Sequence, residues 1–168
     1  MQEAISLEQI TIRTIQLKDN AAIASVIRNT LKEFGANHPG TVYYDEATDH
    51  LYELFSNTPR SIYHVAEWDG AIVGGGGIFP TYGLPEDTCE LVKMYLLPSV
   101  RSIGLGRLLI QKSIDFAKDS GYKQIYLETM PELKQALNTY AKFGFEYIDH
   151  PMGNTGHFGC DLWMLKHL

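Results

Sequence analysis

The sequence predicts an α/β (α+β) fold, in which helices cover a mixed, mostly antiparallel central sheet. Segments with strand-like alternation and segments with helical periodicity follow one another in the order β-α-α-β-β-β-α-β-α-β-β, which gives about seven strands and about four helices. The chain has 168 residues, 45% of them hydrophobic, and contains no polar linker. It is therefore long enough to bury a core, and we expect a single domain over residues 1–168.

The first third of the chain predicts one strand and two helices. Residues 10–16 (ITIRTIQ) alternate and are rich in β-branched side chains, as strands are. Residues 20–34 have an apolar stripe at helical spacing, with Asp19 placed to cap this helix and Gly35 placed to end it. A loop that contains glycine and proline follows, and residues 46–55 predict a second, shorter helix.

A β-hairpin is predicted next. Residues 61–67 and 71–79 have strand-like composition, and Asp69-Gly70 between them is a preferred sequence for a two-residue hairpin turn. A run of glycines, residues 74–77, lies within the second strand. Because glycine has no side chain to pack, this run predicts a bulge or a close approach of another part of the chain.

The second half of the chain alternates strands and helices. A strong strand (residues 88–97) precedes a strong helix (residues 104–119), and another strand (residues 123–130) follows. The next helix has an apolar face and ends at a glycine; the residues concerned are Leu133, Leu137, Tyr140, Ala141 and Gly144. Two strands, residues 145–149 and 158–166, close the chain across a glycine-containing loop.

Charge and composition exclude several classes of function. There are 14 basic and 20 acidic residues, a formal net charge of −6, whereas a protein that binds nucleic acid needs a basic surface. No apolar run approaches the roughly 20 residues of a membrane span, and the N-terminal segment MQEAISLEQI does not resemble a signal peptide. Cys89 and Cys160 do not make a disulfide framework, so we expect a reducing, cytoplasmic location.

Residues 98–107 (PSVRSIGLGR) link a predicted strand to a predicted helix. Gly104 and Gly106 would let the backbone approach a ligand closely, and free N–H groups at a helix N-terminus bind anions such as phosphate. Arg101 and Arg107 would add charge-assisted hydrogen bonds. A tight strand–helix connection that binds nothing explains the two glycines equally well at this point.

Two common phosphate-binding patterns fit poorly. The P-loop is absent, because no Gly-Lys-Ser/Thr follows the glycines. A dinucleotide-binding pattern has two of its glycines here, and Glu128 follows about 20 residues later, as a ribose-binding acid would. Against it, Leu109 replaces the third glycine, and residues 98–103 separate the strand from the first one. Because the match to this pattern is partial, a nicotinamide-dependent oxidoreductase stays an alternative.

Two motifs make the chain similar to the GCN5-related N-acetyltransferase (GNAT) superfamily. The segment from Arg101 to Gly106 matches the family signature Gln/Arg-x-x-Gly-x-Gly/Ala and follows a strand that ends in proline. Downstream, ALNTYAKFGF resembles the pattern Ala-x-x-x-Tyr-x-x-x-Gly-Phe, with Tyr140, Gly144 and Phe145 in register. The resemblance is good over about residues 60–150 and implies a GNAT-like arrangement of the predicted sheet and helices.

The resemblance implies acetyl-CoA-dependent transfer of an acetyl group to an amine, without a covalent enzyme intermediate. Backbone N–H groups of the signature loop would hold the pyrophosphate of acetyl-CoA, and the edge of the preceding strand would pair with its pantetheine amides. The cofactor-binding residues so implied are Met94, Tyr95, Leu96, Arg101, Ser102, Ile103, Gly104, Leu105, Gly106 and Arg107. The sequence does not identify the acceptor, which is a small molecule or a protein amine.

Three residues are implied as catalytic. Tyr140 corresponds to the family residue beside the CoA sulfur, although a core tyrosine would also explain its place on an apolar helix face. A phenol pKa of ~10 exceeds a thiol pKa of ~8.5, so a hydrogen bond to the developing thiolate is favoured over early proton transfer. Glu90 matches the general base of the histone-acetylating branch and Glu128 that of the ribosomal-protein-acetylating branch. The sequence does not choose between them.

Other features leave alternatives open. Leu133 stands where many family members have an asparagine that touches the pantetheine arm, so a non-catalytic acyl-CoA-binding or regulatory module is also allowed. His150, His157 and Cys160 fit no standard zinc pattern, and no metal site is predicted. The resemblance also implies that the early helical region lines the acceptor site, although a surface loop would explain the residues concerned equally well; they are His38, Tyr43, Tyr44 and Asp45. His157 could contact the acceptor. A homodimer is common on this fold, but nothing in the sequence indicates one.

Overall fold

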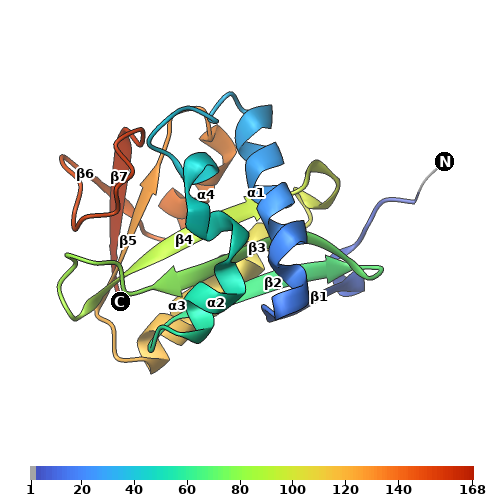
Figure 1. Cartoon of the computed structure of the whole chain (residues 1–168), viewed down its shortest axis with the longest axis horizontal. Coiled ribbons are helices and arrows are strands. Elements are labelled where there is room, and N and C mark those ends of the chain that lie inside the picture. Colours follow the sequence, from blue (N-terminus) through green and yellow to red (C-terminus); the bar gives the residue numbers. More distant parts are fainter. Residues whose placement is uncertain (1–2) are drawn as a thin grey trace.

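The computed structural model describes residues 3–168 and contains a seven-stranded sheet in the order β1-β2-β3-β4-β5-β7-β6 (Figure 1). Neighbouring strands are antiparallel except β4 and β5, which are parallel. The strands are β1 (Ile10–Thr14), β2 (Ile62–Trp68), β3 (Ala71–Phe79), β4 (Thr88–Leu96), β5 (Gln124–Thr129), β6 (Glu146–Ile148) and β7 (Leu162–His167). The helices are α1 (Asn20–Glu33), α2 (Leu51–Ser56), α3 (Leu105–Asp119) and α4 (Lys134–Lys142). The mixed, mostly antiparallel sheet with helices is confirmed.

Helices cover both faces of this sheet (Figure 1). The apolar stripes of α1 and α2 share one buried cluster with Tyr63 and Val65 of β2. On the other face, Ile110 of α3 and Tyr140 of α4 share a second cluster with Ile125 of β5. Burial of an amphipathic face, rather than intrinsic propensity, provides most of the stability of such helices. Within residues 3–168, no helix has the length and apolar character needed to cross a membrane.

Asp19 precedes α1 but does not cap it, contrary to the prediction. Its carboxylate accepts hydrogen bonds from the Arg13 guanidinium, at 2.7 and 2.9 Å, and from the Gln16 N–H, at 2.7 Å. Burial would raise the pKa of Asp19, but these bonds outweigh it and the pKa is lowered. The side chain therefore ties β1 to the start of α1 instead of satisfying the first turn of the helix.

Two element boundaries also differ from the prediction. Residues 46–55 do not form one helix: a 3-10 turn at Glu46–Asp49 precedes α2, because His50 (φ −134°, ψ 40°) leaves the helical region. The last strand begins at Leu162 rather than at residue 158. The preceding residues form a loop instead, and the Gly159 N–H in this loop donates a hydrogen bond to a carbonyl of the loop after α1, that of Gly40 (2.9 Å).

The topology rules out the dinucleotide-binding alternative. A dinucleotide-binding fold is built from repeated parallel βαβ units. In the described part of the chain only β4, α3 and β5 form such a unit, and β5 is followed by an antiparallel partner, β7. The oxidoreductase interpretation is therefore wrong.

The glycine run in β3 makes room for the ring of Tyr63. A Cβ on Gly77 would lie 2.3 Å from the Ile62 carbonyl oxygen and 2.9 Å from the Tyr63 ring. That ring is fully buried, and its hydroxyl donates a hydrogen bond to the Lys93 carbonyl oxygen at 2.7 Å. The β3–β4 register also shifts between Gly75 and Gly77. The close approach and the bulge that the glycines predict are both present.

We expect Gly77→Ala to lower the melting temperature clearly, because overpacking a tight core costs about 1–3 kcal/mol and the contacting oxygen belongs to a neighbouring strand. Thermal unfolding followed by circular dichroism measures this. Gly106→Ala is the control, since its Cβ would meet only Leu96 Cδ1, at an ordinary 3.5 Å. A melting temperature of Gly77→Ala equal to that of the wild type would contradict the close approach.

Candidate active site

Strands β4 and β5 separate partway along their length. Their parallel pairing runs from Thr88 to Glu90 and ends at the pair Glu90 and Tyr126. The rest of β4, up to Leu96, has no partner strand on this side within residues 3–168. An unpaired strand edge offers N–H and C=O groups to an extended ligand.

A cavity of about 560 Å³, called the larger cavity below, lies along this unpaired edge. The residues that line it and that the argument uses are Lys93, Met94, Tyr95, Leu96, Arg101, Ser102, Gly104, Gly106, Arg107, Glu128, Thr129, Leu133, Asn138 and Tyr140. They come from β4, from the loop and first turn of α3, from the end of β5 and from α4. The structure thus brings the two sequence motifs, far apart in the chain, to one cavity.

The start of α3 has the features of an anion site. Ser102 (φ +65°) and Gly104 (φ +94°) both have left-handed backbone conformations, which glycine adopts at little cost. The first helical hydrogen bond runs from the Leu108 N–H to the Gly104 carbonyl oxygen (3.1 Å). The N–H groups of Leu105, Gly106 and Arg107 therefore precede the helical ladder, at the positive end of the helix dipole. An anion such as a pyrophosphate would satisfy them.

Three of the predicted cofactor-binding residues have side chains that are already engaged within the protein. Ile103 and Leu105 pack into an apolar cluster below the loop, so only their backbone groups are available to a ligand. The Arg101 guanidinium donates to the Leu96 carbonyl oxygen (2.8 and 3.1 Å) and forms a bidentate ion pair with Glu33 (2.6 and 2.9 Å). Arg101 thus fixes the loop against β4 and α1.

Tyr140 faces the larger cavity from α4 but is largely buried. Its ring packs edge-on against Phe145, with 5.9 Å between centroids, so it also contributes to the core. Burial raises the pKa of its hydroxyl above the ordinary value, which keeps the proton on oxygen at any working pH. Leu133, which replaces the family asparagine, lines the same cavity, and Asn138 lines it two residues before Tyr140.

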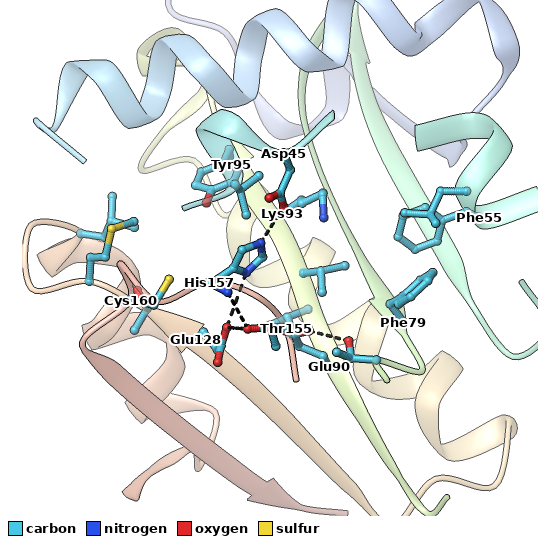
Figure 2. Close-up of a pocket in the computed structure, with 18 residues that line it drawn as sticks. Asp45, Phe55, Phe79, Glu90, Lys93, Tyr95, Glu128, Thr155, His157 and Cys160 are labelled. Atoms are coloured by element: carbon cyan, nitrogen blue, oxygen red, sulfur yellow. Dashed lines mark hydrogen bonds and ion pairs between the residues drawn. The ribbon is translucent and has the colours of Figure 1, made fainter. Parts of the chain in front are cut away.

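A second cavity of about 160 Å³, called the smaller cavity, lies beside the larger one (Figure 2). Its charged lining residues are Asp45, Glu90, Lys93, Glu128 and His157. Its apolar lining residues include Val42, Leu54, Phe55, Phe79, Val92 and Met130. The residues common to both cavities are Leu91, Lys93, Tyr95, Glu128, Thr129 and Leu133, so the two meet where β4 and β5 separate.

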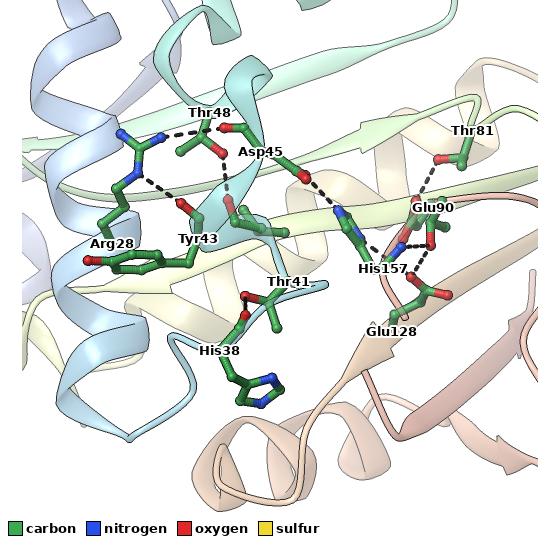
Figure 3. A network of polar contacts seen from close by, with 12 residues as sticks. Arg28, His38, Thr41, Tyr43, Asp45, Thr48, Thr81, Glu90, Glu128 and His157 are labelled. Atoms are coloured by element: carbon green, nitrogen blue, oxygen red, sulfur yellow. Dashed lines mark hydrogen bonds and ion pairs between the residues drawn. The ribbon is translucent and has the colours of Figure 1, made fainter. Parts of the chain in front are cut away.

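Glu90 lies in the smaller cavity at the point where the strands part. Its carboxylate is buried and accepts a hydrogen bond from the Thr81 hydroxyl at 2.5 Å (Figure 3). Burial penalises the charged form, and with the nearby Glu128 carboxylate it raises the pKa of Glu90 to about 7, despite the Thr81 bond. A carboxyl group with such a pKa can exchange a proton near neutral pH.

Glu128 has a different environment. Its carboxylate accepts hydrogen bonds from the Tyr126 hydroxyl (2.7 Å) and the Thr155 hydroxyl (2.5 Å), and His157 Nδ1 lies 3.5 Å from it. These contacts come from its own strand and from the loop before β7, and they fix the orientation of the carboxylate. Glu128 is therefore held in place at the junction of the two cavities, with both carboxylate oxygens already engaged.

His157 connects two loops across the smaller cavity (Figures 2 and 3). It comes from the loop before β7, and its Nε2 lies 2.6 Å from Asp45 Oδ2, in the loop after α1. Burial would lower the pKa of His157, but hydrogen bonds with Asp45 and Glu128 raise it to about 9, so the ring is cationic at neutral pH. Arg28 of α1 holds the Asp45 loop by donating to the carbonyl oxygens of Tyr43 (3.1 Å) and Asp45 (3.4 Å).

Glu128, His157 and Cys160 place three potential metal ligands within 4.8 Å of one another. Burial raises the pKa of the Cys160 thiol to about 12, whereas metals bind the thiolate. Both ring nitrogens of His157 already face carboxylates. These features disfavour metal binding, and the sequence expectation of no metal site stays a prediction.

Sequence reasoning missed several residues of the site. Lys93 was the one with a visible signal, because it is a lysine inside the mostly apolar second half of a strand (LVKMYL). Thr81, Thr155 and Tyr126 supply hydroxyl donors to the two glutamates, but their positions carry no pattern that marks them.

Comparisons with known proteins agree with this geometry. The family model described as "Acetyltransferase (GNAT) family" matches residues 27–145. The chain is 42% identical over 165 residues to "Uncharacterized N-acetyltransferase YjgM" of Escherichia coli, covering 98% of both chains. A GNAT acetyltransferase structure from Staphylococcus aureus superposes with a TM-score of 0.79, at 21% identity, over 94% of this chain and 98% of that one.

A further similar structure is that of yncA, a putative acetyltransferase from Salmonella typhimurium solved with acetyl-CoA. It has a TM-score of 0.71 and 21% identity, and the match covers 94% of this chain and 93% of that one. The match to the family model spans more than half of the sequence, and the E. coli relative is similar over almost its whole length. The chain therefore belongs to the GNAT acetyltransferase family and is an N-acetyltransferase.

Proposed function

We propose that the larger cavity binds acetyl-CoA and that the smaller cavity binds the amine that receives the acetyl group. The observation that carries this proposal is the meeting of the two cavities at the point where β4 and β5 part, with Glu90 beside the junction. Acetyl-CoA would supply an activated acetyl thioester there. The amine could then reach the acetyl group directly, without a covalent intermediate on the protein.

The residues of the larger cavity fit acetyl-CoA. The free N–H groups at the start of α3, with the Arg107 side chain, offer donors to the pyrophosphate. The unpaired edge of β4 around Met94 offers backbone groups to the pantetheine amides. The Leu96 carbonyl oxygen is already occupied by Arg101, so we assign the edge pairing to Met94 and Tyr95.

We assign the role of general base to Glu90 and a different role to Glu128. A base must accept a proton at working pH, and a carboxylate with a pKa of about 7 and a single hydrogen-bond donor suits this task. Both oxygens of Glu128 are engaged by hydroxyl donors and by His157, so we assign Glu128 the role of orienting His157 and the loop that lines the smaller cavity. This assignment is compatible with direct proton transfer from the amine to Glu90 and with transfer through one water molecule.

Tyr140 is proposed to donate a hydrogen bond to the CoA sulfur as the thiolate forms. We expect Tyr140→Phe to reduce kcat by about 100- to 1,000-fold, because one donor to a developing charge is lost, while the dissociation constant of acetyl-CoA changes little. Steady-state kinetics and calorimetric titration measure the two effects. Tyr147→Phe is the control, because Tyr147 is an exposed residue of β6. An unchanged kcat would leave Tyr140 with a packing role alone.

The proposed function is tested by thiol release from acetyl-CoA in the presence of a panel of primary amines. Amine-dependent release, with the N-acetyl product identified by mass spectrometry, is expected. Binding of acetyl-CoA without turnover on any amine would instead favour the non-catalytic acyl-CoA-binding module. No binding of acetyl-CoA by the folded protein would overturn the proposal.

We also propose that residues 1–168 act as one catalytic domain, because one chain supplies all the lining residues of both cavities. The reaction would then need no second copy, and a homodimer is a separate proposal that sedimentation would test. A cytoplasmic location is proposed from the two cysteines, Cys89 and Cys160, which are both buried free thiols.

A further inference from the structure

The Lys93 ammonium group lacks a partner in the smaller cavity. Within residues 3–168, no hydrogen bond or ion pair of its Nζ is formed, although Glu90 and Asp45 are close enough to act on it through their charge. Burial lowers the pKa of Lys93, and the two carboxylates only partly oppose this effect. The Lys93 side chain is half-buried and lines both cavities, so an ammonium group without an acceptor in the protein is available to an anionic ligand there.

A bulge in β4 directs this lysine into the cavity. Leu91 packs against the α3 face of the sheet and Val92 against the α1 face. Regular alternation would place the next residue, Lys93, on the α3 face. Instead Met94 packs on the α3 face, the register shifts, and Lys93 adopts a φ of +52°, which is uncommon outside glycine. Local strain of this kind gathers at functional sites.

Two charged groups of the smaller cavity, the Glu90 carboxylate and the Lys93 ammonium, lack a full set of hydrogen-bond partners. Asp45 and Glu128 are both engaged with the cationic ring of His157. Glu90 has one hydroxyl donor, and Lys93 has no acceptor. Figure 2 shows Lys93 and Glu90 facing the same cavity. An amine alone would satisfy Glu90 but would leave the Lys93 ammonium unpaired.

Resting on the proposed function, we propose that the acceptor is a small zwitterion, a free α-amino acid with an apolar side chain. Its amine lies toward Glu90 and its carboxylate pairs with Lys93. The apolar side chain contacts the aromatic wall that Phe55 and Phe79 form (5.3 Å between centroids). Thr129 lines the junction, and its hydroxyl, buried without a partner in the described chain, is a second free donor there.

This class of acceptor differs from protein amines in a testable way. A peptide N-terminus or a lysine side chain in a protein carries no free carboxylate beside its amine, so it would not pair with Lys93. A cavity of about 160 Å³ is comparable to engineered cavities that hold one benzene-sized molecule, which also suits a small acceptor.

The experiment compares three acceptors that share one side chain: L-leucine, L-leucinamide and 3-methylbutan-1-amine. The second lacks the negative charge of leucine and the third lacks the whole carboxylate. We measure kcat/KM for each with wild type and Lys93→Met. We expect the wild type to prefer L-leucine, and Lys93→Met to lower the ratio of L-leucine to L-leucinamide by about 10- to 100-fold through a higher KM for L-leucine. Comparing ratios cancels the different intrinsic reactivities of the amines.

Lys118→Met is the matched control, because Lys118 is exposed in the last turn of α3. Thermal unfolding checks that each variant folds, and calorimetric titration with acetyl-CoA checks the larger cavity separately. Equal or better use of the two uncharged acceptors by the wild type would overturn the inference. A Lys93→Met protein that loses kcat equally on all three would overturn it too, and would place Lys93 at the acetyl group.

The inference also fails, with the proposed function intact, if none of the three compounds is acetylated while another amine is. Failure of the proposed function has a different signature. In that case acetyl-CoA itself does not bind, or no amine of any class is acetylated.

Discussion

Gly106→Glu is expected to weaken acetyl-CoA binding by at least about 100-fold, because like charges brought together at a binding site cost several kcal/mol. Gly106 lies in the first turn of α3 and lines the larger cavity. A side chain can be built there without a steric clash, since a Cβ would contact only Leu96, at 3.5 Å. The new carboxylate would occupy the positive end of the helix dipole and repel the pyrophosphate.

Calorimetric titration of acetyl-CoA measures this loss, and Leu108→Glu is the matched control. Leu108 is an exposed residue of the same helix and does not line the larger cavity, so the same charge is added near the site but outside it. Wild-type affinity in Gly106→Glu would mean that the phosphates bind elsewhere. Equal losses in both variants would mean that net charge, and not position, explains the effect.

Glu90→Gln is expected to lower kcat/KM by about 100- to 10,000-fold, the usual contribution of a positioned general base. The amide keeps the size of the side chain and an oxygen that can accept the Thr81 hydrogen bond. Because burial penalises the charged carboxylate, the melting temperature at pH 8 should be unchanged or higher. Glu86→Gln, in an exposed loop, is the matched control. A fully active Glu90→Gln would transfer the role of base to Glu128.

The pH profile gives an independent test of the same assignment. Burial raises the pKa of Glu90 to about 7, and the base acts only when deprotonated. The wild-type kcat/KM should therefore fall by about tenfold for each pH unit below 7 and level off above it. The residual activity of Glu90→Gln should lack this fall. The same fall in the variant would show that another group, such as the acceptor amine, titrates.

The segment from β4 through α3 to β5 could be predicted from the sequence because its signals are local. Strand alternation, a proline, two glycines and an apolar helical stripe follow one another without a gap. The region of residues 46–55 was harder, since its apolar spacing does not reveal that His50 leaves the helical conformation. Asp19 illustrates a tertiary effect: a good capping residue is taken by a neighbouring arginine instead.

The smaller cavity could be predicted only in part. Glu90 and Glu128 were found through the family resemblance, but the contacts that distinguish them depend on burial and on hydroxyls from distant loops. The contact between Asp45 and His157 joins residues 112 positions apart. No local pattern encodes such a pair. Lys93 shows the same limit, because the bulge that turns it is visible only once β3 and β4 are paired.

The bulge gives β4 one residue more than β3 between the pairs on either side of it. The side chains that β4 presents therefore depend on the length of the strand as well as on the identity of its residues. Removing Lys93 would restore regular alternation, with Val92 and Tyr95 on the α1 face and Met94 on the α3 face, and would take the ammonium group out of the smaller cavity. A single-codon deletion here would therefore remove, in one step, the group that we propose to bind the carboxylate of the acceptor.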